Sequence, residues 1–321
     1  MGTILAVLCL ALQSDPFLVE GPPFLAHGDR VDLRAANIPK DTEVVWRLAD
    51  ATPGCIETRP AFTASSPVVR GTSELVVTST GRVDGEIRFA VSAERHGIRV
   101  ATAEFRLRVG PLIPMKVWCR VVDNALGGTA TPERVQDPCR RRAIETDVNN
   151  RLRPLGIQVS LVAGPPVVAP DAWFDKEGRF QPVTLKDGKK ANTPSLNELL
   201  KAGFLGGLNV YFVRDCYWEQ IQEGFERTVL AHELLGVGLK EGQAVVDDAA
   251  DSDSLAHELG HALGLDDLKT KGERDRLMYW VRRERTGFAL SYGEMKDARE
   301  SAQRHLKAWA KASVGASVRI R

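Results

Sequence analysis

The sequence has almost no excess of charge of either sign. Its 321 residues include 43 lysine and arginine residues and 42 aspartate and glutamate residues, so the formal net charge is +1. A protein that attracts a polyanion through its overall field needs a basic surplus, and this chain has none. The composition therefore gives no support to nucleic acid as a partner.

Long hydrophobic runs are missing as well. A transmembrane helix needs about 20 consecutive apolar residues, and the longest apolar run covers only residues 4–12. It lies at the N-terminus and is followed by polar residues and Pro16, the pattern of a secretory signal peptide without basic residues in front. We therefore expect residues 1–15 to be a signal peptide, no transmembrane span, and a protein that is secreted or held at the cell envelope. The alternative is an apolar first strand.

Cysteine is scarce, with five residues in the whole chain. Removal of a signal peptide would take Cys9 away and leave Cys55, Cys119, Cys139 and Cys216. An even number is compatible with two disulfides in an oxidising compartment, but the spacing does not select a pairing.

Residues 16–111 contain no long stretch with helical periodicity. Short segments with alternating apolar and polar residues predict antiparallel strands, separated by turn signals such as Gly28 and Gly54. With Trp46 inside an apolar strand, this half resembles an immunoglobulin-like β-sandwich that lacks the inter-sheet cysteine pair. We expect an all-β module that binds a surface partner, or else a spacer or pro-region. The expected strands are residues 31–35, 42–48, 73–79, 85–93 and 101–109.

Residues 112–321 follow a break in composition at Gly110 and Pro111, and their pattern alternates between strands and helices. This order predicts a second domain of the α/β (α+β) class. We expect residues 165–192 to be a surface insertion and residues 234–248 to form a hairpin. The other expected elements are strands at 115–123, 157–163 and 208–215 and helices at 132–152 and 195–204.

The chemically distinctive residues lie between positions 257 and 267, which read HELGHALGLDD. On a helix, His257 and His261 share one face, where both imidazoles can bind a single Zn²⁺. Glu258 lies beside the first ligand and can take a proton from a metal-bound water without binding the metal itself. Ser252, Asp253 and Ser254 are the candidates for the N-cap of this helix.

The third ligand is expected after the helix. Gly264 permits the left-handed turn that ends a helix, and Asp267 can then bring a carboxylate back to the same metal. Three protein ligands that leave the fourth position to water are typical of catalytic zinc, whereas structural zinc sites have four protein ligands. The sequence therefore predicts one catalytic Zn²⁺.

The extended motif resembles the HExxHxxGxxH signature of the metzincin metallopeptidases, with Asp267 in place of the third histidine, as in snapalysin-like members. The resemblance covers about residues 114–321 and is specific between residues 256 and 280. It implies that Met278 forms the Met-turn beneath the metal. It also implies that an edge strand at Leu234, Leu235, Gly236 and Val237 binds the extended substrate, with Tyr279 near it.

A second histidine motif, AHELLG, begins at Ala231. Gly236 stands where a second ligand would be needed, so we expect His232 to have a structural role.

These observations predict a secreted zinc-dependent endopeptidase that hydrolyses protein or peptide substrates. Two alternatives stay open. One is a zinc peptidase of another HExxH clan, with Glu284 or Glu294 as third ligand. The other is a non-catalytic surface protein that merely holds a metal, against which the presence of Glu258 argues.

Overall fold

The chain divides into two compact units, Met1–Gly110 and Pro111–Arg321, next to the boundary expected between residues 111 and 112. The expected signal peptide lies outside the described residues. The computed structural model describes residues 16–62, 68–124, 137–186, 189–201, 206–222, 228–233, 236–239, 242–279, 285 and 287–317.

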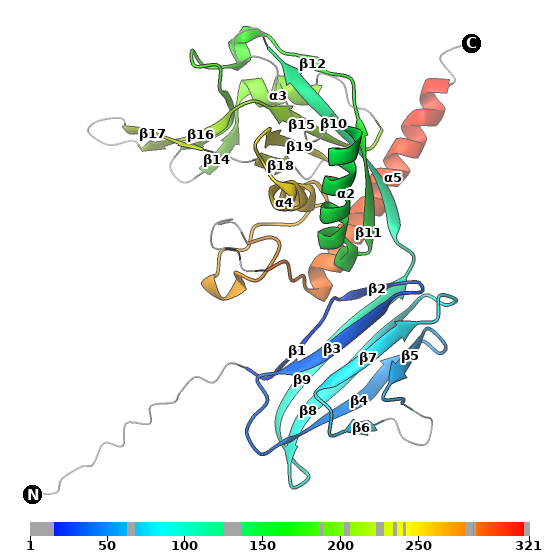
Figure 1. Cartoon of the computed structure of the whole chain (residues 1–321). Coiled ribbons are helices and arrows are strands. Elements are labelled where there is room, and N and C mark those ends of the chain that lie inside the picture. Colours follow the sequence, from blue (N-terminus) through cyan, green and yellow to red (C-terminus); the bar gives the residue numbers. More distant parts are fainter. Residues whose placement is uncertain are drawn as a thin grey trace, which may run out of the picture. The chain divides into compact units, whose positions relative to one another are not determined.

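In the described part of the first unit, the strands form two sheets around a shared core (Figure 1). Except for the parallel pair β2–β9, neighbouring strands are antiparallel. The expected all-β sandwich is therefore confirmed as an architecture. One sheet has the order β1 (Leu18–Glu20), β3 (Arg30–Ala36), β7 (Glu74–Ser79) and β5 (Ile56–Arg59); the other has the order β2 (Phe24–Ala26), β9 (Ile98–Gly110), β8 (Gly85–Arg95), β4 (Glu43–Ala51) and β6 (Val68–Arg70).

Trp46 of β4 is at the centre of this core. Its side chain is fully buried, its ring meets that of Phe89 edge to face with centroids 6.2 Å apart, and its indole N–H donates to the Thr72 carbonyl at 2.9 Å. A buried indole satisfied in this way stabilises the packing of the sheets without a cross-link. Cys55 is a buried free thiol here.

No disulfide is present among the described residues. Cys55, Cys119 and Cys216 are buried free thiols, and Cys139 is an exposed one. The two disulfides considered from the even number of cysteines are therefore not formed.

The second unit is built around a mixed sheet. β10 (Ile113–Asp123) pairs in parallel with β11 (Ile157–Ala163) and β15 (Leu208–Val213), and β15 pairs in parallel with β19 (Gln243–Asp247). The edge strand β18 (Gly236–Leu239) runs antiparallel to β19, as expected for the hairpin. The short β12 (Val167–Val168) pairs in parallel with the last two residues of β10. Every residue of β15 is buried, as a strand covered on both faces requires.

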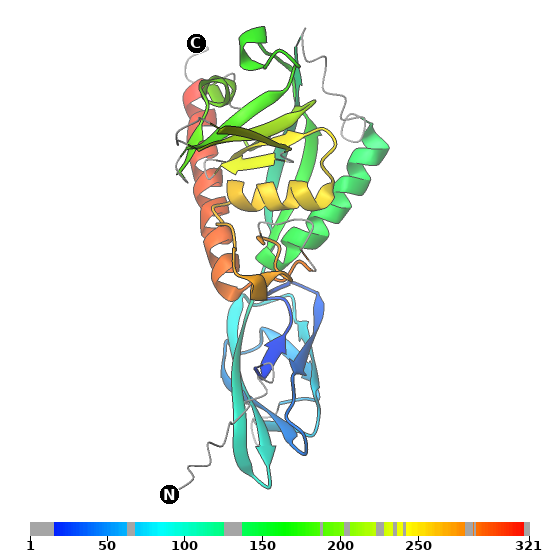
Figure 2. The same cartoon turned by 90° about the vertical axis from the view of Figure 1, so that its left-hand side faces the viewer.

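Helices lie against this sheet. α2 (Pro138–Leu152) connects β10 to β11, α4 (Ser252–Ala262) contacts β18, β19 and α2, and α5 (Tyr292–Ser317) contacts β10. Figure 2 shows α4 lengthwise, with α2 and α5 to either side. α3 (Pro194–Lys201) packs on β13. The unit also contains three short 3₁₀ helices: η1 (Arg153–Leu155), η2 (Asp171–Trp173) and η3 (Lys271–Glu273).

Two expectations for this unit were wrong. Residues 165–192 are not a simple surface insertion, because β13 (Phe180–Lys186) and β14 (Lys189–Asn192) join β16 (Cys216–Gln222) and β17 (Thr228–Glu233) in a second sheet of order β14-β13-β16-β17. The many turn-forming and charged residues gave no strand pattern, although β13 pairs both with the adjacent β14 and with the distant β16. The helix expected from residue 132 begins at Pro138 in the described residues, where Asp137 caps it.

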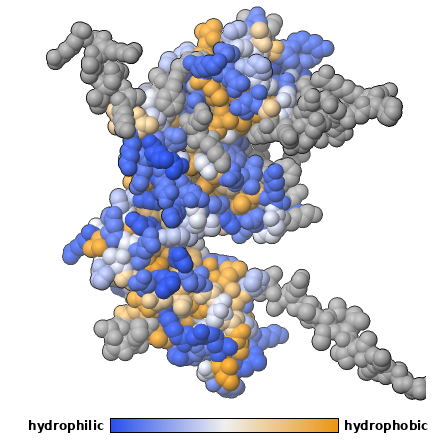
Figure 3. All heavy atoms as spheres, turned by 180° about the vertical axis from the view of Figure 1, so that it is seen from behind, coloured by the Kyte–Doolittle hydropathy of each residue, from blue (hydrophilic) through white to orange (hydrophobic). Residues whose placement is uncertain are grey.

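Isolated apolar residues are exposed on both units, among them Ile98 and Val168. On the face seen in Figure 3, hydrophobic residues are interspersed with hydrophilic ones. Among the helices that the structure describes, none is both long enough and apolar enough to cross a membrane.

Candidate metal centre

α4 begins at Ser252, and its N-cap lies one residue before the three candidates Ser252, Asp253 and Ser254. The N-cap is Asp251, whose carboxylate accepts hydrogen bonds from the Ser254 backbone N–H and hydroxyl, both at 2.9 Å. Asp253 forms an ion pair with Arg151 of α2 instead. A capped start and a partner on α2 fix the helix at this end.

The C-terminal end of α4 forms a Schellman motif. Gly264 has a φ of 93°, its N–H donates to the His261 carbonyl at 2.8 Å, and the Leu265 N–H donates to the Gly260 carbonyl at 3.0 Å. This pair of bonds needs a residue with positive φ, which glycine supplies at least cost. The turn reverses the chain, so that residues 265–267 return over the last turn of the helix.

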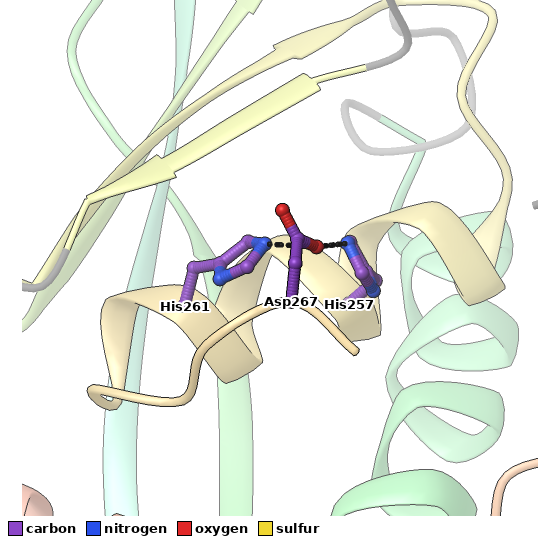
Figure 4. A group of neighbouring side chains, drawn as sticks. All are labelled: His257, His261 and Asp267. Atoms are coloured by element: carbon purple, nitrogen blue, oxygen red, sulfur yellow. Dashed lines mark ion pairs between the residues drawn. The ribbon is translucent and has the colours of Figure 1, made fainter. Parts of the chain in front are cut away.

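This reversal brings three potential ligands together (Figure 4). Asp267 Oδ1 lies 3.4 Å from His257 Nε2 and 3.2 Å from His261 Nε2. The three ligand atoms all lie within 4.8 Å of one another. Among the described residues, this is the group of histidine, cysteine and carboxylate side chains that could hold a metal.

Backbone carbonyls orient both imidazoles. His257 Nδ1 is 3.0 Å from the Leu277 carbonyl oxygen, and His261 Nδ1 is 2.8 Å from the Leu265 carbonyl oxygen. In a neutral imidazole, a protonated Nδ1 donates to its carbonyl, and the lone pair of Nε2 is then available to a metal. Metal-binding histidines are commonly oriented in this way.

His257 has a second contact on the same nitrogen. Arg285 Nη2 lies 3.0 Å from His257 Nδ1 and also donates to the Tyr279 carbonyl at 3.0 Å. A guanidinium only donates, so this contact favours the tautomer with the proton on Nε2, whereas Leu277 favours the opposite one. Only the tautomer that Leu277 favours leaves Nε2 free to bind a metal.

The spacing of the donor atoms fits zinc. Two ligand atoms that each lie about 2.0 to 2.1 Å from a tetrahedral Zn²⁺ are about 3.3 to 3.4 Å apart. The observed separations of 3.4 and 3.2 Å between Asp267 and the two histidines are close to this value. Two imidazoles and one carboxylate also form a donor set that zinc accepts, with a fourth position left over. The residues present therefore fit the ion.

The charges of the three groups are complementary in the absence of a metal. Burial by itself would raise the pKa of the Asp267 carboxyl, but hydrogen bonds from His257 and His261 and their positive charge hold it well below its usual range. Burial disfavours the charged form of His261, yet Asp267 and Glu258 together raise its pKa. The carboxylates of Asp267 and Glu258 therefore favour positive charge near the two imidazoles, as a cation site requires.

Glu258 projects from the same helix but is outside the three-residue group. It is 7% exposed and lies against the edge strand β18, where a Cβ built on Gly236 would be 2.7 Å from its Cγ. Its carboxylate is not one of the three grouped ligands, and its charge acts on His261.

The predicted Met-turn residue lies beneath α4. Met278 is fully buried, and a Cβ built on Gly260 of the helix would be 2.5 Å from its sulfur. Its carbonyl accepts a hydrogen bond from the Leu268 N–H at 2.8 Å, which ties this segment to the chain that follows Asp267. Tyr279 is only 2% exposed, so its side chain is packed in the interior and the expected contact with substrate is not supported.

The predicted substrate strand is only partly described. Leu234 and Leu235 lie outside the described residues, while Gly236 and Val237 begin β18 and are buried. The backbone of His232 lies in strand β17, paired with Trp218, and so the second histidine motif is not helical.

Of the two glutamates considered as alternative third ligands, Glu294 is described and is not part of the three-residue group. Glu294 forms an ion pair with Arg276 and accepts hydrogen bonds from the Ser291 backbone N–H and hydroxyl, both at 2.7 Å, at the start of α5. Glu284 lies outside the described residues.

Two features of the site were missed by the sequence reasoning. The carbonyls of Leu265 and Leu277 leave no trace in a sequence, because every residue has a carbonyl. The glycines of β18 do leave a trace: a Gly-Val-Gly strand indicates close approach of another backbone, and this signal was not used.

Comparisons with known proteins do not identify the chain. No protein-family model and no curated protein matches it. Solved structures with partial likeness include a C. elegans member of the MSP family (10% identity, 28% of this chain and 96% of that one, TM-score 0.21) and a conjugative transposon lipoprotein from Bacteroides eggerthii (17%, 30% and 98%, TM-score 0.20). A 2,6-sialyltransferase from a Photobacterium species of the Vibrionaceae also matches in part (13%, 59% and 40%, TM-score 0.24). At these TM-scores the likenesses show neither a family nor a function.

Proposed function

We propose that the second unit is a zinc-dependent endopeptidase of metzincin type, with His257, His261 and Asp267 as the zinc ligands and Glu258 as the base. One observation supports the proposal: Asp267 lies at about the spacing of tetrahedral ligands from both imidazoles, all three donor atoms lie within 4.8 Å of one another, and the buried Glu258 acts on His261 through its charge. A purely structural zinc site has no need of such a base.

The protein's residues divide the chemistry among them. When bound, zinc supplies a Lewis acid that polarises the scissile carbonyl and makes a water molecule more acidic. Glu258 accepts the proton of the attacking water and later delivers it to the leaving amine. The Leu265 and Leu277 carbonyls favour the tautomers of His261 and His257 that ligation needs, and at His257 this opposes the effect of Arg285.

We also propose that the protein is secreted or held at the cell envelope, and that the β-sandwich is an appended module with a surface partner. The apolar run at residues 4–12 and the position of the sandwich ahead of the second unit in the sequence support this. Expression of the full chain, followed by N-terminal sequencing of exported protein, tests it; exported protein should begin near residue 16.

Substitution of Glu258 separates catalysis from metal binding. Glu258→Ala should lower kcat on an unfolded protein substrate by about 100-fold or more, the usual contribution of a general base. Zinc content should stay at one ion per chain, because Glu258 is not a ligand. The measurements are kcat and metal analysis on the purified native protein and the variant.

Glu294→Ala is the matched control. It removes a carboxylate from the start of α5, where Arg276 and Ser291 bind it, and should leave zinc in place. Loss of zinc in Glu294→Ala would favour the other HExxH clan. A native protein that binds zinc but cleaves nothing would favour the non-catalytic metal-holding protein.

A further inference from the structure

The edge strand β18 and helix α4 approach each other unusually closely. Gly236 and Gly238 are two residues apart in β18 and lie opposite Val246 and Ala244 of β19. Alternate residues of a strand point to the same face. Both glycines therefore present a bare Cα to α4, and the atoms that a side chain would meet differ between the two.

At Gly238 the obstacle is the framework of the helix. A Cβ there would lie 2.3 Å from the Glu258 carbonyl oxygen and 2.4 Å from the Cβ of His261. Neither atom can move without moving α4. Gly238 is therefore needed for the packing of strand on helix.

At Gly236 the obstacle is one side chain. A Cβ there would lie 2.7 Å from Cγ, 3.0 Å from Cδ and 3.1 Å from Oε1 of Glu258. All three atoms belong to the carboxyl arm of the proposed base. A methyl group at this position could be accommodated by rotation of that arm, while the helix and the ligands stay in place.

We propose that Gly236 is a positioning residue for Glu258: its bare Cα forms the wall against which the carboxyl arm rests, and so fixes where the proton acceptor lies. The inference rests on the proposed function. It assigns to Gly236 a task other than the contact with substrate expected from the sequence.

The expected effect follows from the sensitivity of catalysis to geometry. A displacement of about 1 Å at a reacting group can cost about 100-fold in rate. Gly236→Ala should therefore lower kcat by about 100-fold and change KM little, with one zinc still bound. Gly236→Ser should lower kcat at least as much. Gly272→Ala is the control, because nothing lies within 4 Å of a Cβ at that position; it should leave kcat unchanged.

A double-mutant cycle on stability tests the same contact without any activity. If the added methyl group strikes the side chain of Glu258, the loss of unfolding free energy caused by Gly236→Ala should vanish in a Glu258→Ala background. The loss caused by Gly238→Ala should persist there, because its obstacles are the backbone of residue 258 and His261. Crystal structures of the zinc-loaded native protein and Gly236→Ala should show the Glu258 carboxylate displaced.

The outcomes separate the two proposals. Native kcat in Gly236→Ala, or an unmoved Glu258 carboxylate, would overturn the positioning role. A stability loss that Glu258→Ala does not relieve would overturn it too and make Gly236 a packing residue like Gly238. If the native protein binds zinc but has no peptidase activity, the proposed function fails, while the cycle and the crystal structures still decide whether Gly236 positions Glu258.

Discussion

At the scale of single residues, the site depends on one carboxylate that the sequence could only suggest. Both Asp266 and Asp267 are exposed, but Asp267 contacts both imidazoles, whereas Asp266 is outside the ligand group. The register after Gly264 decides which of the two aspartates reaches the metal. The Schellman motif, with its two backbone hydrogen bonds, fixes that register.

Substitutions at these two positions test the ligand set. Asp267→Ala should lose zinc in a mild chelator. Its zinc affinity should fall by more than about 10- to 100-fold, the loss that is typical when a residue hydrogen-bonded to a metal ligand is removed. Asp267→His should keep the ion, because imidazole is an equally competent ligand. Zinc content after dialysis against chelator measures both. Asp266→Ala, the control, should behave like the native protein; retention of zinc in Asp267→Ala would place the third ligand elsewhere.

The proposed ligands and the proposed base could be selected from the sequence because their spacing is local. His257, Glu258 and His261 follow from helical geometry, and Asp267 from one turn after it. The groups that orient them could not be identified, because Leu277 and Arg285 reach His257 only through tertiary structure. Burial of Tyr279 is likewise a property of packing and not of the motif.

At the scale of elements, the helix that carries the ligands is held at both ends. Asp251 caps its start and Gly264 ends it. The cap lies at the first turn, His257 and His261 lie on the second and third turns, and Asp267 follows the helix. Cap and metal should therefore act on the same element but be separable in experiment.

Loss of the cap should cost stability and leave metal binding almost unchanged. Asp251→Ala leaves backbone N–H groups at the start of α4 without their acceptor, which typically costs about 1 kcal/mol. Asp251→Ser can still cap and should cost only a fraction of that. Urea unfolding of the zinc-loaded proteins measures the difference; equal destabilisation by alanine and serine would show that Asp251 acts through something other than capping.

The elements that sequence patterns predicted best are those with strong local periodicity. β11 coincides with its expected residues, and β10 and β15 differ from theirs only at the ends. β13 and β14 were missed, because the residues KKAN of β14 have no apolar pattern and because β13 also pairs with β16, more than 30 residues away in sequence. The strands β1, β2, β5 and β6 were missed because three or four residues are too few to show an alternating pattern.

At the scale of the whole molecule, the sequence predicted two units and the composition break marked the division. Gly110 closes β9 of the sandwich, and β10 begins three residues later at Ile113. The Ile113 N–H donates to the Gly156 carbonyl at 2.9 Å, so the first strand of the second unit is anchored within that unit. This arrangement suits a second unit that folds by itself.

A fragment of residues 111–321 should therefore be soluble, bind one zinc ion and cleave an unfolded protein with a kcat/KM within a few-fold of the full chain. The reason is that each unit has its own core and the boundary cuts no strand. Circular dichroism, metal analysis and peptidase assay of the fragment test this. Insoluble or inactive fragment would indicate that the sandwich supports folding, as a pro-region does.

The closeness of the ligands in sequence has a consequence for what the ion can do to the fold. All three lie between positions 257 and 267, so the ion joins points that the chain already holds near each other. The entropy removed from the unfolded chain by such a cross-link grows with the logarithm of the loop that it closes, and this loop is short. A zinc ion bound here would therefore stabilise one helix end and its turn through its own binding energy, and the long-range architecture of both units would depend on their hydrophobic cores.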